Sequence, residues 1–158
     1  MGQVILLSLL LVMLTFLFHY KVLLSLSVYS ARINLVNQSR VLLIVLVLFF
    51  AHVVEIGCYA LAYAWSVEGL KLGALKGLEM HEPMDYLYFS TVIYTSLGLG
   101  DVYPDGHIRF LTGIEALNGL FLIAWSASFT FLVMSRLWPW SDCCDRIDKY
   151  KDGGNDKR

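Results

Sequence analysis

Three long hydrophobic blocks dominate the pattern of hydrophobic and polar positions along this chain. The blocks lie at 1–30, 41–67 and 116–135; the first two hold one formal charge each, Lys21 and Glu55, and the third holds none. An α-helix rises about 1.5 Å per residue, so about 20 apolar residues cross a hydrocarbon core about 30 Å thick. The pattern therefore predicts an all-α membrane protein with three transmembrane helices.

Charged residues near the ends of these blocks predict how the helices are oriented. Arg32 and Arg40 lie between the first two blocks and Arg136 follows the third, whereas acidic residues outnumber basic ones in the stretch 68–109. Lys and Arg gather at span ends on the cytoplasmic side of a membrane. We therefore expect the amino terminus and the stretch 68–109 to lie outside. The polar and partly disordered tail, 138–158, is then cytoplasmic.

Composition narrows the class of protein further. Of the 158 residues, 58% are hydrophobic and 16% are charged, whereas about a quarter of the residues of a soluble domain are charged. The net charge of −1 and the lack of a basic run give no reason to expect nucleic acid as a partner. No Lys or Arg precedes Lys21, so we interpret the first block as a retained helix rather than a signal peptide. Small size and the lack of eukaryotic sorting signals favour a bacterial inner membrane.

The external stretch contains a second kind of hydrophobic segment. An apolar and aromatic run at 84–95 is too short to span a bilayer. Pro83 precedes it and Asp85 lies in its first turn, both of which favour the start of a helix. Gly98 and Gly100 follow at once, and a long helix comes next. A short helix and a glycine-alternating strand at membrane depth require a cavity that several copies of the chain together enclose.

The run Thr95-Ser96-Leu97-Gly98-Leu99-Gly100-Asp101 carries a family resemblance. It resembles the T-T-V-G-Y-G-D signature of tetrameric potassium channels in the two-helix "ion channel" family, and the likeness extends over about 84–138. The resemblance implies a potassium-channel-like tetramer with an extra helix at its periphery. The implied parts are a peripheral helix 1–30, a cytoplasmic loop 31–40 and a pore domain 41–137. That domain comprises an outer helix 41–67, a pore helix 84–95, a selectivity filter 95–101 and an inner helix 108–137.

The resemblance implies a passive, potassium-selective cation channel without a cofactor, in which K⁺ is the permeant ion. Rings of backbone carbonyls replace the hydration shell of the ion in such filters. Glycine reaches positive φ without steric cost, so Gly98 and Gly100 let successive carbonyls face one axis. The implied pathway runs along Ser96 to Gly100, with K⁺ bound at the carbonyls of Ser96, Leu97, Gly98 and Leu99.

Two positions depart from the family pattern. Leu99 stands where the family has a tyrosine whose hydroxyl braces the filter, so a laxer filter that still conducts is expected. Val92 stands where some bacterial members have a glutamate that braces the filter aspartate. Asp101 then needs another partner or stays solvated. Four copies of Asp101 would concentrate cations at the outer mouth.

The third helix is expected to line the inner pore. Gly119 suits a hinge or a close contact with the pore helix, and Glu115 suits a hydrogen bond that anchors the pore helix and so supports the filter. The expected lining and hinge residues are Gly119, Leu120, Ile123, Ala127 and Phe131. In the second span, His52 precedes Glu55 by three residues, so the two side chains can pair. A proton-sensing role for that pair is an open alternative to a structural one.

Three functions compete. The first is a potassium channel; its partners are further copies of the chain in a homotetramer, membrane lipid, monovalent cations and an unidentified gating subunit. The second is a non-selective sodium/potassium channel, and the third is a non-conducting regulatory or assembly subunit. An enzyme is not expected, because the sequence holds no catalytic triad, metal-ligand spacing or phosphate loop. No span carries arginine at every third residue, so a voltage sensor is not expected.

Overall fold

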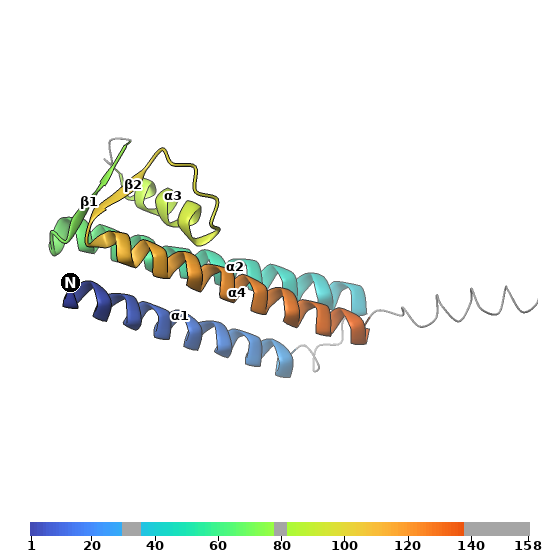
Figure 1. Ribbon diagram of the computed structural model, residues 1–158. Coiled ribbons are helices and arrows are strands. Elements are labelled where there is room, and N and C mark those ends of the chain that lie inside the picture. Colours follow the sequence, from blue (N-terminus) through green and yellow to red (C-terminus); the bar gives the residue numbers. More distant parts are fainter. Residues whose placement is uncertain (30–35, 78–81, 138–158) are drawn as a thin grey trace, which may run out of the picture.

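The computed structural model describes residues 1–29, 36–77 and 82–137. Three long helices lie side by side: α1 (Gly2–Tyr29), α2 (Asn37–Ala64) and α4 (Ile108–Leu137) (Figure 1). A π-helical turn, Trp65–Gly69, extends α2. All three helices are long and apolar enough to cross a membrane, which confirms the predicted three-span fold. The predicted tail, with Cys143 and Cys144, and the first half of the predicted loop 31–40 lie outside the described residues.

A short helix sits at one end of the bundle, against α2 and α4 (Figure 1). This helix, α3 (Pro83–Tyr94), begins at a proline whose missing N–H costs nothing at the first helical position. Glu82 and Asp85 form a reciprocal capping box around that start, in which the Glu82 N–H donates to Asp85 Oδ2 at 2.9 Å. The amino terminus lies at the same end of the molecule as α3 (Figure 1).

A two-stranded antiparallel ribbon flanks α3, and the sequence did not predict it. Strand β1 (Gly73–Lys76) pairs with β2 (Tyr103–Gly106), with Gly73 opposite Gly106 and Lys76 opposite Tyr103. The ribbon joins the end of α2 to the start of α4, so α3 and the segment after it form a loop closed at its base (Figure 1). An exposed ion pair between Lys76 Nζ and Asp105 Oδ2, at 2.5 Å, lies on it.

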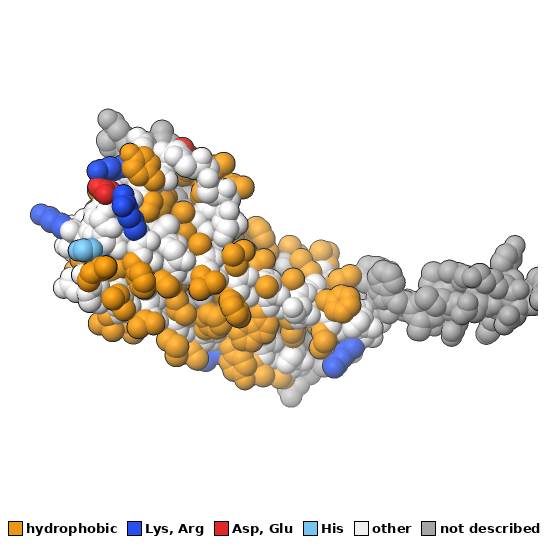
Figure 2. Space-filling view, in the orientation of Figure 1, with side chains coloured by type: hydrophobic (Ala, Val, Ile, Leu, Met, Phe, Trp, Pro, Cys, Tyr) orange, Lys and Arg blue, Asp and Glu red, His pale blue; other side chains and the backbone are white. Residues whose placement is uncertain are grey.

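The hydrophobic interior is divided along the bundle. One buried cluster lies near α3 and is rich in aromatic side chains, including Tyr59, Tyr63, Phe89 and Tyr94. A second cluster joins α1 to α2 further along, through Leu23, Leu26, Ile44 and Leu48. The outer surface is also hydrophobic, and charged side chains gather over the ribbon end (Figure 2). A surface of this kind suits lipid or further copies of the chain rather than water.

Candidate ion pathway

Segment 95–101 leaves the carboxyl end of α3 and turns back toward the ribbon. The backbone N–H of Leu97 still donates to the carbonyl of Val92 at 3.0 Å, so the first turn is anchored to the helix. Along the segment, φ is positive at Ser96 (56°), Gly98 (59°) and Gly100 (81°), that is, at every second residue. The two glycines adopt the expected positive φ. Ser96 was not expected to, and a non-glycine residue there costs about 1–3 kcal/mol.

This segment is uncovered in the single chain. All seven residues from 95 to 101 are exposed, and the leucine side chains Leu97 and Leu99 are 64% and 58% exposed. A Cβ added at Gly98 or Gly100 would meet no atom within 4 Å. Two exposed leucines beside two glycines with empty space around them indicate a surface that another protein chain covers. Burial of the leucine side chains would stabilise such a contact.

The partner of Asp101 is a tyrosine of α3. The Tyr88 hydroxyl donates to Asp101 Oδ2 at 2.5 Å, and the Val102 N–H donates to Asp101 Oδ1 at 3.0 Å. The bond from Tyr88 holds the pKa of the Asp101 carboxyl below its usual range. Val92, where a bracing glutamate was considered, is buried and apolar. Sequence reasoning missed Tyr88, although its place one turn before Val92 on the same helix was a usable signal.

Glu115 is buried behind α3, where it joins three helices. The Tyr63 hydroxyl of α2 donates to Glu115 Oε2 at 2.6 Å, and Ser90 Oγ of α3 lies 2.6 Å from Glu115 Oε1. Ser90 Oγ also lies 2.9 Å from the carbonyl oxygen of Ile56. The expected hydrogen bond between Glu115 and the short helix is therefore present. Whether it supports a filter stays a prediction.

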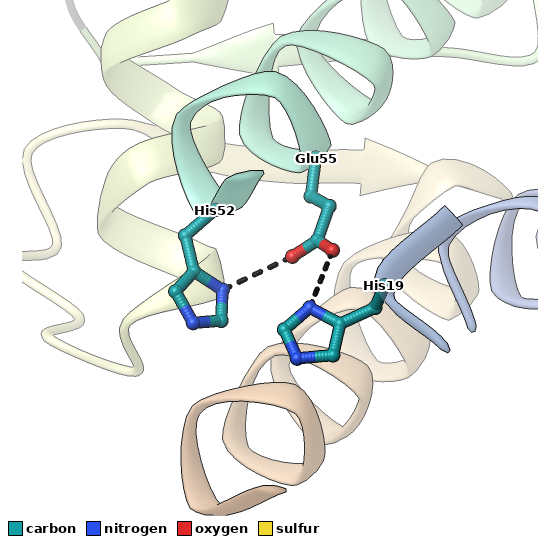
Figure 3. A group of neighbouring side chains, drawn as sticks. All are labelled: His19, His52 and Glu55. Carbon is teal, nitrogen blue, oxygen red and sulfur yellow. Dashed lines mark hydrogen bonds and ion pairs between the residues drawn. The ribbon is translucent and has the colours of Figure 1, made fainter. Parts of the chain in front are cut away.

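A second buried polar cluster lies at the carboxyl end of α3. Glu55 Oε2 accepts from the Tyr94 hydroxyl at 2.5 Å and lies 3.0 Å from His52 Nδ1, so the expected His52–Glu55 pair is present. The other oxygen, Oε1, lies 2.9 Å from Nδ1 of His19 on α1 (Figure 3). Ser126 of α4 completes the cluster. His19 was not predicted, although a histidine inside an apolar span is a functional signal in its own right.

A third polar contact ties α1 to the other helices nearer its amino end. The Asn118 amide of α4 donates to Thr15 Oγ1 at 2.9 Å and to the Tyr59 hydroxyl at 3.0 Å. All three side chains are buried in the described part of the chain. Hydrogen bonds of this kind join helices in a membrane, where apolar side chains gain nothing by leaving lipid. They attach α1 specifically to this bundle.

The residues expected to line the inner pore fall into two groups. Leu120, Ile123, Ala127 and Phe131 are exposed on α4. Gly119 is buried instead. It lies so close to the end of α3 that an added Cβ would collide with the carbonyl oxygen of Tyr94. Of the two reasons considered for this glycine, the structure favours close packing against α3 over a place in the lining.

The fold and these buried contacts define an integral membrane protein with a channel-like fold: three spans, and a short helix followed by a glycine-containing turn between the second and third. Residues 42–136 match the family described as Ion channel, so the chain belongs to that family. Helix α1 precedes the matched region and is additional to it. No curated protein and no solved structure matches the chain. The protein is thus an ion channel by family, and the family is one of channels rather than enzymes.

Proposed function

We propose that the chain forms a homotetrameric, potassium-selective channel whose filter is segment 95–101. The observation that carries this proposal is the positive φ at Ser96, Gly98 and Gly100, every second residue of an exposed segment. Backbone that alternates between positive and negative φ turns successive carbonyls toward one side instead of alternating them as a strand does. One-sided carbonyls are what a dehydrated potassium ion needs.

The exposed surface supports a tetramer. Leu97 and Leu99 are uncovered in the single chain. A second exposed surface, the α4 stripe, consists of Leu120, Ile123, Ala127 and Phe131. Four copies around an axis would bury the leucines behind the filter and turn the stripe toward the inner pore. The extra helix α1 packs on α4 and α2, so it would lie at the periphery of that assembly.

Flux from liposomes tests this proposal directly. Purified protein is reconstituted with internal potassium, and efflux is compared with sodium and caesium, with and without barium. Potassium-selective, barium-sensitive flux is expected. Equal sodium and potassium flux would replace the proposal with a non-selective channel, and no flux from a verified tetramer would replace it with a non-conducting regulatory or assembly subunit.

A non-selective filter is the second candidate because of Leu99. Its side chain is 58% exposed, and leucine offers no hydroxyl to brace the loop. A hydrogen bond that is missing here is worth about 0.5–1.5 kcal/mol. The substitution Leu99→Tyr is therefore expected to lower the sodium-to-potassium permeability ratio or to slow inactivation, measured from reversal potentials and current decay. A variant unchanged in both respects would show that this position does not set selectivity.

We propose further that the amino terminus and the ribbon lie outside and the end of α4 inside, in a bacterial inner membrane. The shared position of the amino terminus and α3 at one end of the bundle supports this topology (Figure 1), as does Arg136 in the last turn of α4. In a chain with Cys58, Cys143 and Cys144 replaced by serine, an impermeant thiol reagent should label Lys71→Cys in intact cells. Labelling of Arg136→Cys instead would reverse the orientation.

A further inference from the structure

The cluster around Glu55 has the composition of a metal site. His19 of α1 and His52 and Glu55 of α2 each offer a ligand atom, and these atoms lie within 4.8 Å of one another. Both imidazole rings turn a nitrogen toward the single carboxylate (Figure 3). His19 and Glu55 are fully buried, and the His52 side chain is 17% exposed. We propose that this cluster binds a divalent transition-metal ion of the zinc class, held by His19, His52 and Glu55.

The distances fit such an ion. Ligand atoms about 2.0–2.2 Å from zinc lie about 3.3–3.6 Å apart in a tetrahedral site. His19 Nδ1 lies 2.9 Å from Glu55 Oε1, and His52 Nδ1 lies 3.0 Å from Glu55 Oε2. The three ligand atoms lie within 4.8 Å of one another, so an ion between them requires the two rings and the carboxylate to adjust their positions. Two imidazoles and one carboxylate form a donor set that binds zinc in preference to magnesium or calcium.

Tyr94 is placed to supply the fourth ligand. Its hydroxyl lies 2.9 Å from His52 Nδ1 and 2.5 Å from Glu55 Oε2. If its hydroxyl proton is released to solvent when the ion binds, the phenolate would give a fourth ligand and, together with the carboxylate, balance the two positive charges of the ion. A neutral site avoids most of the cost of burying charge within a membrane.

Ser126 lies against the second ring nitrogen of both histidines. Its hydroxyl oxygen lies 3.0 Å from His52 Nε2 and 3.1 Å from His19 Nε2. If both rings are neutral and donate from Nδ1 to Glu55, two bare Nε2 atoms face one hydroxyl, which can donate to only one of them. With a metal on both Nδ1 atoms, each ring carries its proton on Nε2 and donates to one of the two lone pairs of Ser126. Ligating histidines characteristically have such partners on the second nitrogen.

The site is accessible from a groove between α2 and α4. That groove is lined by His52 and Ser126 together with Ala127, Thr130 and Phe131. The partial exposure of His52 lies on this side, so an ion can reach the cluster without unfolding the bundle. A bound ion would fasten α1 to α2 and fix Tyr94, the residue directly before segment 95–101. Binding does not require that the channel conducts, so the two proposals fail independently.

Zinc titration of the purified, chelator-treated protein tests the site. Calorimetry and cobalt absorption are used in a chain with Cys143 and Cys144 replaced by serine, because adjacent thiols bind zinc themselves. One ion per chain is expected, with the visible cobalt bands of four-coordinate geometry and a raised thermal midpoint. His52→Gln and Glu55→Gln should lose binding, and Ser126→Ala should weaken it about 10- to 100-fold. His107→Gln is the matched control, since His107 is exposed at the ribbon end.

A variant that keeps a ligand separates metal binding from a folding role. His19→Cys retains a zinc ligand, so it should bind zinc and give cobalt a new near-ultraviolet sulfur band, whereas His19→Gln should do neither. Failure of the wild-type chain to bind more zinc than Glu55→Gln would overturn the proposal and leave a shared proton as the occupant of the cluster. Equal binding by the His52→Gln and His107→Gln variants would also overturn it.

Discussion

Gly119 occupies the point at which α4 comes closest to the end of α3. A Cβ at this position would collide with the carbonyl oxygen of Tyr94, and backbone cannot move aside as a side-chain tip can. We expect Gly119→Ala to separate the two helices and to lower the unfolding free energy by about 1–3 kcal/mol. Thermal unfolding in detergent measures the change.

The same helix provides the control for that substitution. Gly113 lies in α4 with no atom within 4 Å of an added Cβ. Gly113→Ala should therefore raise stability by about 0.5–1 kcal/mol, the usual gain of alanine over glycine in a helix. If both alanine variants moved the thermal midpoint in the same direction, close packing at Gly119 would not be the reason for its glycine.

The Tyr88 hydroxyl is the hydrogen-bond donor that α3 provides to Asp101. Because its hydrogen bond lowers the pKa of Asp101, the folded protein keeps this carboxylate charged to a lower pH than an unfolded chain does. The stabilising effect is present above the unfolded pKa and is lost as pH falls through the folded one. Protonation of Asp101 would remove the charge that is expected to concentrate cations at the outer mouth, so we expect potassium flux to fall at acid pH. Tyr88→Phe should therefore raise the pKa of Asp101 and shift this fall in flux to higher pH.

A pH titration of flux checks this expectation against two further variants. Asp101→Asn should flatten the acid limb altogether, since no carboxylate remains to titrate. Tyr86→Phe is the control, because Tyr86 donates to Glu68 rather than to Asp101. An acid limb that stayed in place in Tyr88→Phe would show that another group governs it.

At the scale of elements, α3 was predictable and the ribbon was not. Pro83, Asp85 and the following apolar run are local signals, and α3 begins and ends within one residue of the expected 84–95. Strands β1 and β2 have four residues each, contain glycine and proline, and pair across the whole of α3. Nothing local indicates such a pairing, because strand formation here depends on the ends of α2 and α4 being brought together.

The exact partner of a buried polar residue was predictable only within one helix; for Glu115 the sequence indicated the short helix but not Ser90. His52 and Glu55 are three residues apart on α2, so their contact follows from helix geometry. The contacts of His19 with Glu55 and of Asn118 with Thr15 depend on how α1 is rotated about its axis. Hydrophobic residues surround each span, so periodicity indicates no preferred face and leaves this rotation open. The polar positions were visible in the sequence, but their partners were not.

Ser90 links α3 to the two helices behind it. Its hydroxyl lies within hydrogen-bonding distance of Glu115 and of the Ile56 carbonyl, and it is fully buried. Ser90→Ala leaves a buried carboxyl oxygen without this partner, so we expect a loss of about 1–3 kcal/mol in unfolding free energy. Thr91→Ala is the matched control: Thr91 is exposed and its hydroxyl donates to a carbonyl of its own helix, so a change within about 0.5 kcal/mol is expected. Equal losses would mean that α3 is held by other contacts.

At the scale of the whole molecule, many large hydrophobic side chains remain exposed after the single chain has formed its core. Helices α1 and α2 can meet lipid with this surface, but the leucines of segment 95–101 follow a re-entrant helix rather than a span. Irregular backbone at membrane depth must be surrounded by protein or water. Assembly around segment 95–101 satisfies this condition for every copy at once, and cyclic symmetry closes such a contact without leaving an open end.

A cysteine at Phe131 can test whether the inner ends of the α4 helices meet in the proposed tetramer. Phe131 is 71% exposed on the half of α4 that lies away from the ribbon, whereas Leu10 is 59% exposed on α1, which is peripheral in the proposed tetramer. In a chain with the three native cysteines replaced by serine, Phe131→Cys should bring copies together near the axis. We expect oxidation to cross-link it into dimers and a cationic thiol reagent applied from the cytoplasmic side to block potassium flux. Leu10→Cys should do neither, because lipid surrounds it in the proposed tetramer. Cross-linking through Leu10→Cys with none through Phe131→Cys would place α1 at the subunit contact and the α4 stripe toward lipid, and the arrangement of the tetramer would have to be reversed.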